Sequence, residues 1–121
     1  MPRNTGPDKT VVDAVLERAQ YSCEACGAMV GDRRGFDYSV HHRRPRGMGG
    51  TRRFGTNLPS NLMILCGSAN TGCHGLVESN RFAALARGFL VQQHEDPSMV
   101  MVKVGGSWIY LGNDCTYRAA P

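Results

Sequence analysis

The sequence predicts a small α+β domain that depends on a metal ion as well as on its apolar core. Three observations support this fold class. The chain has 121 residues with an ordinary globular composition, 41% hydrophobic and 20% charged, which suits one domain spanning residues 1–121. Apolar residues recur at helical spacing near the N-terminus, and short β-rich segments follow later. Four cysteines at metal-binding spacing lie between these regions.

The N-terminal part predicts a flexible arm over residues 1–9 and a helix that begins near Thr10. Thr10, followed three residues later by Asp13, resembles a capping box. The apolar residues that follow recur at helical spacing and predict one buried helix face. They are Val11, Val12, Val15, Leu16 and Ala19.

The middle of the chain predicts a strand, a long loop and a short apolar segment. Residues 37–42 favour a strand because Tyr38 and Val40 have high β-propensity. Residues 43–57 contain four glycines among several arginines, and loops of this length are often functional. Residues 62–65 form an apolar run.

The C-terminal half predicts one helix and several short strands. The helix is expected to run from Cys73 to Arg87, with Gly88 as its stop. Gly105 and Gly106 form a hairpin-turn signal between two of the strands. The expected strands cover residues 89–92, 100–104 and 108–111, and we expect them to cover the core.

The sequence predicts a cytoplasmic protein that does not enter a membrane. The N-terminus has no apolar signal region behind it. No stretch approaches the roughly 20 apolar residues needed to span a bilayer. In a reducing compartment, cysteines bind metal more often than they form disulfides.

Four of the five cysteines therefore predict a structural zinc site. Cys23 and Cys26 are separated by two residues, and Cys66 and Cys73 by six, in a glycine-rich turn that can fold back. Four thiolates suit tetrahedral zinc. Disulfide pairing is the alternative, and the expected compartment disfavours it. Cys115 has no partner at a suitable spacing and is expected to be a free thiol.

Clustered arginines predict a polyanionic partner. The formal net charge is +4, but the window from residue 33 to 53 holds seven arginines and a single acid, Asp37. Arginine forms forked hydrogen bonds to phosphate, so the window favours nucleic acid, although a solvated basic loop that aids solubility is the alternative. The candidate contacts to a DNA backbone are Arg43, Arg44, Arg46, Arg52 and Arg53.

Three histidines lie within or directly beside the part of the chain that the four cysteines would hold together. His41 and His42 end the predicted strand, and His74 directly follows a cysteine. A zinc site that joins residues 23–26 to residues 66–73 would bring the three histidines close together. The convergence of three histidines favours a second metal or catalytic site over three unrelated side chains.

Two local features qualify this histidine site. Neighbouring residues on a regular strand point to opposite faces, so we expect irregular backbone at His41 and His42, with Pro45 marking the end of the strand. His94 lies in a polar turn without such context and is expected to be exposed and inert.

Three segments together resemble the HNH endonuclease family. They are DYSVHHRRP at residues 37–45, SNLMILC at residues 60–66 and CHGLVES at residues 73–79. More narrowly, the chain is similar to small HNH nucleases of actinobacterial bacteriophages and prophages. The similarity covers residues 21–91 as the HNH core, followed by C-terminal strands and a tail over residues 92–121.

The resemblance implies a ββα-metal core and metal-dependent hydrolysis of DNA phosphodiesters, by nicking or double-strand cleavage, with low sequence specificity. It implies that His42 is the general base and that Asn61 orients the hairpin loop and the base. It also implies one catalytic divalent ion (Mg²⁺, Mn²⁺, Ni²⁺ or Zn²⁺) bound by His41 and His74. Glu78, one helical turn after His74, is either a further ligand or a surface acid that balances Arg81 or Arg87.

Two other functions fit parts of the sequence. A non-catalytic, zinc-stabilised DNA-binding module would keep the cysteines and arginines but give no role to His42 or Asn61. A structural member of a phage packaging complex is the second alternative. The resemblance implies DNA as the partner and also suggests the phage terminase, which a nuclease of this kind would assist in DNA packaging.

Overall fold

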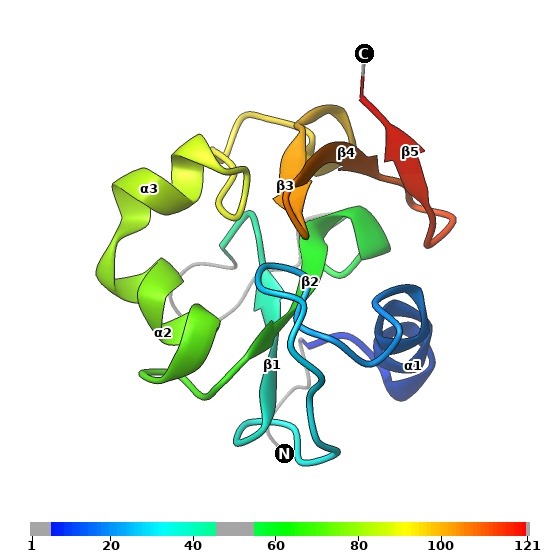
Figure 1. Cartoon of the computed structure of the whole chain (residues 1–121). Coiled ribbons are helices and arrows are strands. Elements are labelled where there is room, and N and C mark those ends of the chain that lie inside the picture. The colour runs from blue at the N-terminus through cyan, green and yellow to red at the C-terminus, as the bar shows by residue number, and fades with distance from the viewer. Residues whose placement is uncertain (1–5, 46–54, 121) are drawn as a thin grey trace, which may run out of the picture.

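A computed structural model of the chain describes residues 6–45 and 55–120 and has a mixed α+β fold with two small sheets (Figure 1). The first sheet pairs β1 and β2 in antiparallel orientation, and the second has the antiparallel order β3-β4-β5. No helix in the described ranges is long and apolar enough to cross a membrane. The elements are α1 (Lys9–Arg18), β1 (Tyr38–His42), the 3-10 helix η1 (Pro59–Asn61), β2 (Leu62–Cys66), α2 (Gly72–Ser79), α3 (Arg81–Ala86), the 3-10 helix η2 (Pro97–Met99), β3 (Val102–Val104), β4 (Ser107–Leu111) and β5 (Tyr117–Ala119).

Strand β2 lies at the centre of the molecule, with α1 on one side and α2 and α3 on the other (Figure 1). Met63 and Leu65 pack in one core with α2, α3 and the second sheet, whereas Leu62 and Ile64 pack in another core with α1. Successive side chains on a strand point to opposite faces, so a strand that is buried on both faces is a continuous apolar run. The run at residues 62–65 is therefore this central strand.

Helix α1 begins earlier than the sequence predicts. Its N-cap is Asp8, whose Oδ1 accepts a hydrogen bond from the Val11 backbone N at 3.3 Å. The predicted capping box is wrong, because Thr10 lies inside the helix and the Asp13 carboxylate accepts from Lys9 Nζ at 2.6 Å. The predicted apolar face is confirmed, since the buried residues of this segment are Val12, Val15, Leu16 and Ala19.

The single helix predicted from Cys73 to Arg87 is two helices that meet at Asn80. Asn80 has φ −138° and ψ 76°, which is not helical. Its side chain accepts a hydrogen bond from Ala83 N at 3.2 Å and caps α3. An asparagine that bonds the backbone in this way starts a new helix instead of continuing the old one.

The C-terminal strands agree with the sequence in part. The β3–β4 hairpin turns at Gly105 and Gly106, as predicted. The strand predicted over residues 89–92 is wrong: the segment is irregular, only residues 89–91 are buried, and its backbone is bonded to the end of α3 and to Arg43. Strand β5 is exposed along its length and lacks the alternation that would have predicted it.

Candidate functional site

The four predicted cysteines converge on one point. The sulfurs of Cys23, Cys26, Cys66 and Cys73 all lie within 4.8 Å of one another, and Cys26 Sγ is 3.9 Å from Cys66 Sγ. Zinc at about 2.3 Å from each sulfur of a tetrahedron separates the sulfurs by about 3.8 Å. The donor set and its spacing therefore fit a metal ion such as zinc.

Local backbone geometry brings the second cysteine pair together. Gly67 and Gly72 have positive φ angles of 95° and 62°, and a side chain on either would overlap the backbone across the turn. The turn closes so tightly that Cys73 N lies 3.4 Å from Cys66 Sγ, and Cys26 N lies 3.5 Å from Cys23 Sγ in the first pair. This closure explains how two cysteines with six residues between them share one centre.

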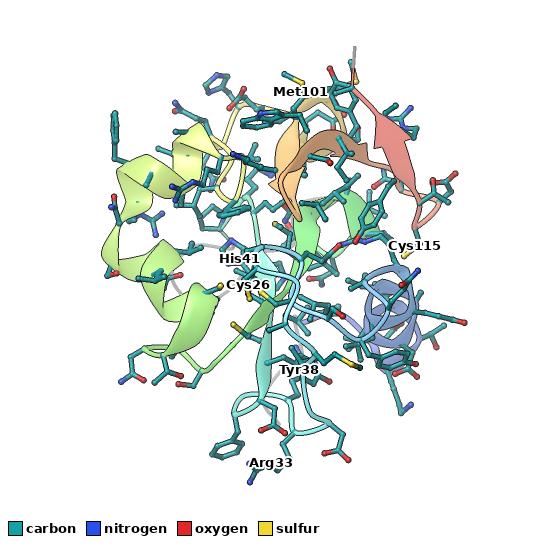
Figure 2. The ribbon with its side chains drawn as sticks, in the orientation of Figure 1. Cys26, Arg33, Tyr38, His41, Met101 and Cys115 are labelled. Atoms are coloured by element: carbon teal, nitrogen blue, oxygen red, sulfur yellow. The ribbon has the colours of Figure 1, made fainter. Side chains whose placement is uncertain are left out.

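The electrostatics of the cysteine cluster also favour a cation. Burial, with the neighbouring cysteine sulfurs, raises the pKa of the Cys73 thiol. A bound cation would hold such thiols as thiolates, which are the form that ligates zinc. All five cysteines lie in the described part of the chain and none forms a disulfide, so Cys115 is a free thiol as predicted. It packs beside α1, away from Cys26 (Figure 2).

A second cluster joins β1 to α2. The donor atoms of His41, His74 and Glu78 lie within 4.8 Å of one another. The two imidazole rings meet edge to face, with centroids 5.4 Å apart. Glu78 extends one carboxylate oxygen toward His74 Nε2, at 4.0 Å, and the other toward Arg81 Nη1, at 3.5 Å. Both expected roles of Glu78 therefore have a partner within reach.

Backbone carbonyls define the tautomers of both imidazoles. His41 Nε2 lies 2.6 Å from Phe89 O, and His74 Nδ1 lies 3.0 Å from Ser68 O. Since a carbonyl only accepts, these nitrogens carry the protons, and His41 Nδ1 and His74 Nε2 keep their lone pairs. Histidines that ligate metals typically donate their second N–H in this manner.

Burial keeps His41 in the form that binds a metal. Its side chain is inside the protein, and this burial lowers its pKa to about 4, an effect that the neighbouring His74 and His42 reinforce. His41 is therefore neutral at pH 7. A neutral imidazole is the form that can donate a lone pair to an ion.

The backbone at the histidine pair is regular, so the predicted irregularity is wrong. His41 pairs with Met63 and His42 with Leu62 in an unbroken register, and the two side chains leave opposite faces of β1. Among the described residues, β2 is the only strand that pairs with β1, and one further isolated bridge joins Arg34 to Tyr38. A cleft of about 390 Å³ beside β1 is lined by Val40, His41, His42, Pro45, His74, Glu78, Arg81 and Leu90. Both histidines reach it.

His42 has a partner that the sequence did not predict. Its Nε2 lies 2.8 Å from Asn57 Oδ1, which makes Nε2 the protonated nitrogen and leaves the lone pair on Nδ1. Asn57 is fifteen residues away along the chain. Only the closure of the intervening loop brings it to the imidazole, and no spacing rule singles it out.

Asn61 is completely buried and bonds the two ends of the loop that follows β1. Its Oδ1 accepts from Arg44 N at 2.6 Å, and its Nδ2 donates to Thr56 O at 2.8 Å and to Arg44 O at 3.2 Å. One side-chain amide thus connects the residues on either side of the 46–54 segment. This arrangement fixes Thr56, the residue directly before Asn57.

Comparisons with protein-family models, curated proteins and solved structures find no match to this chain. The function of the protein therefore has to be inferred from its own two clusters and the cleft beside them. His94, which was expected to be inert, is exposed and belongs to neither cluster.

The predicted DNA contacts of two arginines are wrong. Arg43 is 0% exposed and Arg44 is 7% exposed, and both guanidinium groups donate to backbone carbonyls inside the protein. Burial lowers the pKa of Arg43 to about 10, so it stays protonated at neutral pH without reaching solvent. The other three candidates, Arg46, Arg52 and Arg53, lie outside the described residues.

Proposed function

We propose that this chain is a metal-dependent endonuclease of the HNH type that hydrolyses DNA phosphodiester bonds. The observation that carries the proposal is the pair of imidazoles, His41 and His74, whose lone pairs are available in an open cleft that His42 also lines. The order of elements supports it, because β1, β2 and α2 make an antiparallel strand pair followed by a helix. The sequence resemblance implies a ββα core, with which this order of elements agrees.

The two clusters take different roles in this proposal. The four cysteines supply a complete tetrahedral set, which is typical of structural zinc. His41, His74 and Glu78 supply three donors at the wall of a cleft, which leaves positions for water and substrate. A divalent ion bound there would neutralise charge on the phosphate and stabilise the departing oxygen.

His42 is the proposed general base. Asn57 accepts a hydrogen bond from Nε2 of its ring, and an imidazole in its neutral form can accept a proton from the attacking water. The phosphorus–oxygen bond to the 3′ oxygen then breaks, which leaves a 5′-phosphate and a 3′-hydroxyl. Asn61 acts at a distance by holding the loop that carries Asn57.

Arg81 is the described cation that we propose for contact with the DNA backbone. Its side chain is 54% exposed, lines the cleft and lies against Glu78. Arg81 can contact phosphates, whereas Arg43 and Arg44 are buried and cannot. The further predicted contacts are Arg46, Arg52 and Arg53. Binding through phosphates predicts low sequence specificity and a steep loss of affinity with salt.

Cleavage of supercoiled plasmid tests the proposal. We expect nicked or linear product with Mg²⁺, Mn²⁺ or Ni²⁺, none with a chelator, and a loss of about 100-fold or more for His42→Ala. His94→Ala is the matched control, an exposed histidine outside the cleft, and should cleave normally.

Undiminished cleavage by His42→Ala would overturn the assignment of the base. DNA binding without cleavage under any metal would favour the binding-module alternative. Comparing cleavage with and without a phage terminase in the same assay tests the predicted packaging role.

A further inference from the structure

Arg43, the residue after the histidine pair, is buried, and no carboxylate among the described residues forms an ion pair with it. Its guanidinium makes four hydrogen bonds to described residues, and all four go to backbone carbonyls. Nε donates to Gly88 O at 2.8 Å, Nη1 to Ser60 O and Pro97 O at 2.9 Å each, and Nη2 to Val100 O at 2.8 Å. These carbonyls belong to three stretches of the chain, because Pro97 and Val100 lie in one short turn. Arg43 therefore joins the end of β1 to the segment that precedes the second sheet.

Arg18, another arginine whose side chain is buried, shows a different arrangement. Arg18 pairs with Glu24 at 2.7 Å, so its charge is balanced by a carboxylate. Within the described part of the chain, no carboxylate forms an ion pair with Arg43. Burying a charge is costly, and apolar replacements of buried charges are often neutral or stabilising. A buried arginine held only by carbonyls thus suggests a need to position those carbonyls.

Two hydrogen bonds of Arg43, one to a carbonyl and one from a backbone N–H, flank the carbonyl that accepts from His41. The Arg43 side chain bonds Gly88 O, and the Arg43 backbone O accepts from Val91 N at 2.8 Å. Phe89 lies between these two points, and its carbonyl accepts from His41 Nε2 at 2.6 Å. The irregular segment 88–91 is therefore attached to β1 at both ends, with the histidine contact in the middle.

We propose that Arg43 is a positioning residue for the metal site. By holding segment 88–91 against β1, it keeps the Phe89 carbonyl on His41 Nε2 and so keeps the lone pair on His41 Nδ1 for an ion. This inference rests on the proposed function only in that His41 ligates the ion. It explains why a guanidinium occupies this site, because a single side chain must satisfy four carbonyls at fixed places.

The test compares Arg43→Met with Arg44→Met in zinc-loaded protein. Arg44 is the matched control, since it is adjacent and buried but donates to Glu95 O instead of the 88–91 segment. Nitrogen-15 NMR of the histidine rings reports the tautomer of His41, and calorimetric titration with Ni²⁺ alone reports the affinity of the site. We expect Arg43→Met to lose the single Nε2–H tautomer and to bind Ni²⁺ about 10- to 100-fold more weakly, as other losses of outer-shell partners do. Arg44→Met should change neither.

Three outcomes would overturn the proposal. They are a wild-type His41 protonated on Nδ1, an Arg43→Met protein with unchanged tautomer and Ni²⁺ affinity, and equal losses in Arg44→Met. If Arg43→Met does not fold, Arg43→Lys keeps the charge but has fewer donors, and the wild-type tautomer needs no variant. Failure of DNA cleavage with intact Ni²⁺ binding would reject the nuclease and leave this inference standing. Intact DNA cleavage, together with an unchanged His41 tautomer in Arg43→Met, would reject the role of Arg43 and leave the proposed nuclease function standing.

Discussion

The two clusters of potential ligands differ in how completely the protein surrounds them. The cysteine cluster gathers four identical soft donors from a knuckle and a tight turn. The histidine cluster gathers three mixed donors beside a cleft of about 390 Å³. A metal with four protein ligands has no open coordination position and serves to stabilise the fold. A metal with fewer protein ligands keeps positions that water or substrate can occupy. Donor count and access are therefore the two properties on which we propose a structural role for the cysteine cluster and a catalytic role for the histidine cluster.

The two clusters share one stretch of backbone. Cys73 and His74 are consecutive residues on α2, so whatever fixes the cysteine also fixes the start of the histidine site. The dependence runs in one direction, because His74 contributes no atom to the cysteine cluster. Damage to the cysteines should therefore destroy both clusters, and damage to the histidines should destroy one.

The largest effect is expected from Cys66→Ser. Removal of one thiolate should release the zinc and abolish the cooperative thermal transition, because zinc-binding free energies of about 10 kcal/mol or more act as folding energy in small domains. Metal analysis and circular dichroism measure both. Cys115→Ser, which changes a cysteine outside the cluster, should keep its zinc and its melting temperature. A Cys66→Ser protein with full zinc and normal melting would contradict the structural role.

His74→Ala should separate the clusters. We expect cleavage to fall by at least about 100-fold and Ni²⁺ binding to be lost, because an ion at the cleft loses one of its ligands. Zinc content and melting temperature should stay near wild type. Ser79→Ala, an exposed change on the same helix, is the control. Loss of zinc from His74→Ala would show that the two clusters are not independent.

Glu78 and Arg81 allow a finer test of the open side of the cleft. Glu78→Gln should weaken Ni²⁺ binding by about tenfold, near 1.4 kcal/mol, if the carboxylate ligates the ion. Arg81→Gln should leave Ni²⁺ affinity in place but weaken DNA binding and lower the salt slope by about one. Calorimetry and salt-dependent DNA binding measure the two effects. Unchanged Ni²⁺ affinity in Glu78→Gln would make Glu78 a surface acid. Unchanged DNA binding in Arg81→Gln would give Arg81 no part in DNA binding.

The smallest expected effect concerns pH and the buried imidazole of His41. Its folded pKa of about 4 lies below its ordinary value of 6.5. Between these two pH values His41 is protonated in the unfolded chain but stays neutral in the folded chain. Stability should therefore fall as pH falls from 6.5 toward 4. Between pH 7.5 and 5.5, without added metal, this loss amounts to about 1 kcal/mol. Chemical denaturation of wild type and His41→Gln should show it as a difference in slope, and parallel pH profiles would contradict it.

The sequence by itself determined the features that depend on local spacing. Helical periodicity located the buried face of α1, and the apolar run marked β2. Cysteine spacing identified the four-sulfur cluster, and the adjacency of Cys73 and His74 linked it to the histidines. Each of these properties follows from residue type and separation along the chain, which is why no coordinates were needed.

The tertiary structure alone decided which polar side chains are buried and which segments meet. Residue counting treated Arg43 and Arg44 as surface charges, but the fold buries both among backbone carbonyls. Loop closure put Asn57 on His42, and the side chain of Asn80 split one predicted helix into two. Burial and long-range hydrogen bonds depend on how distant segments pack, and a local pattern carries no record of that packing.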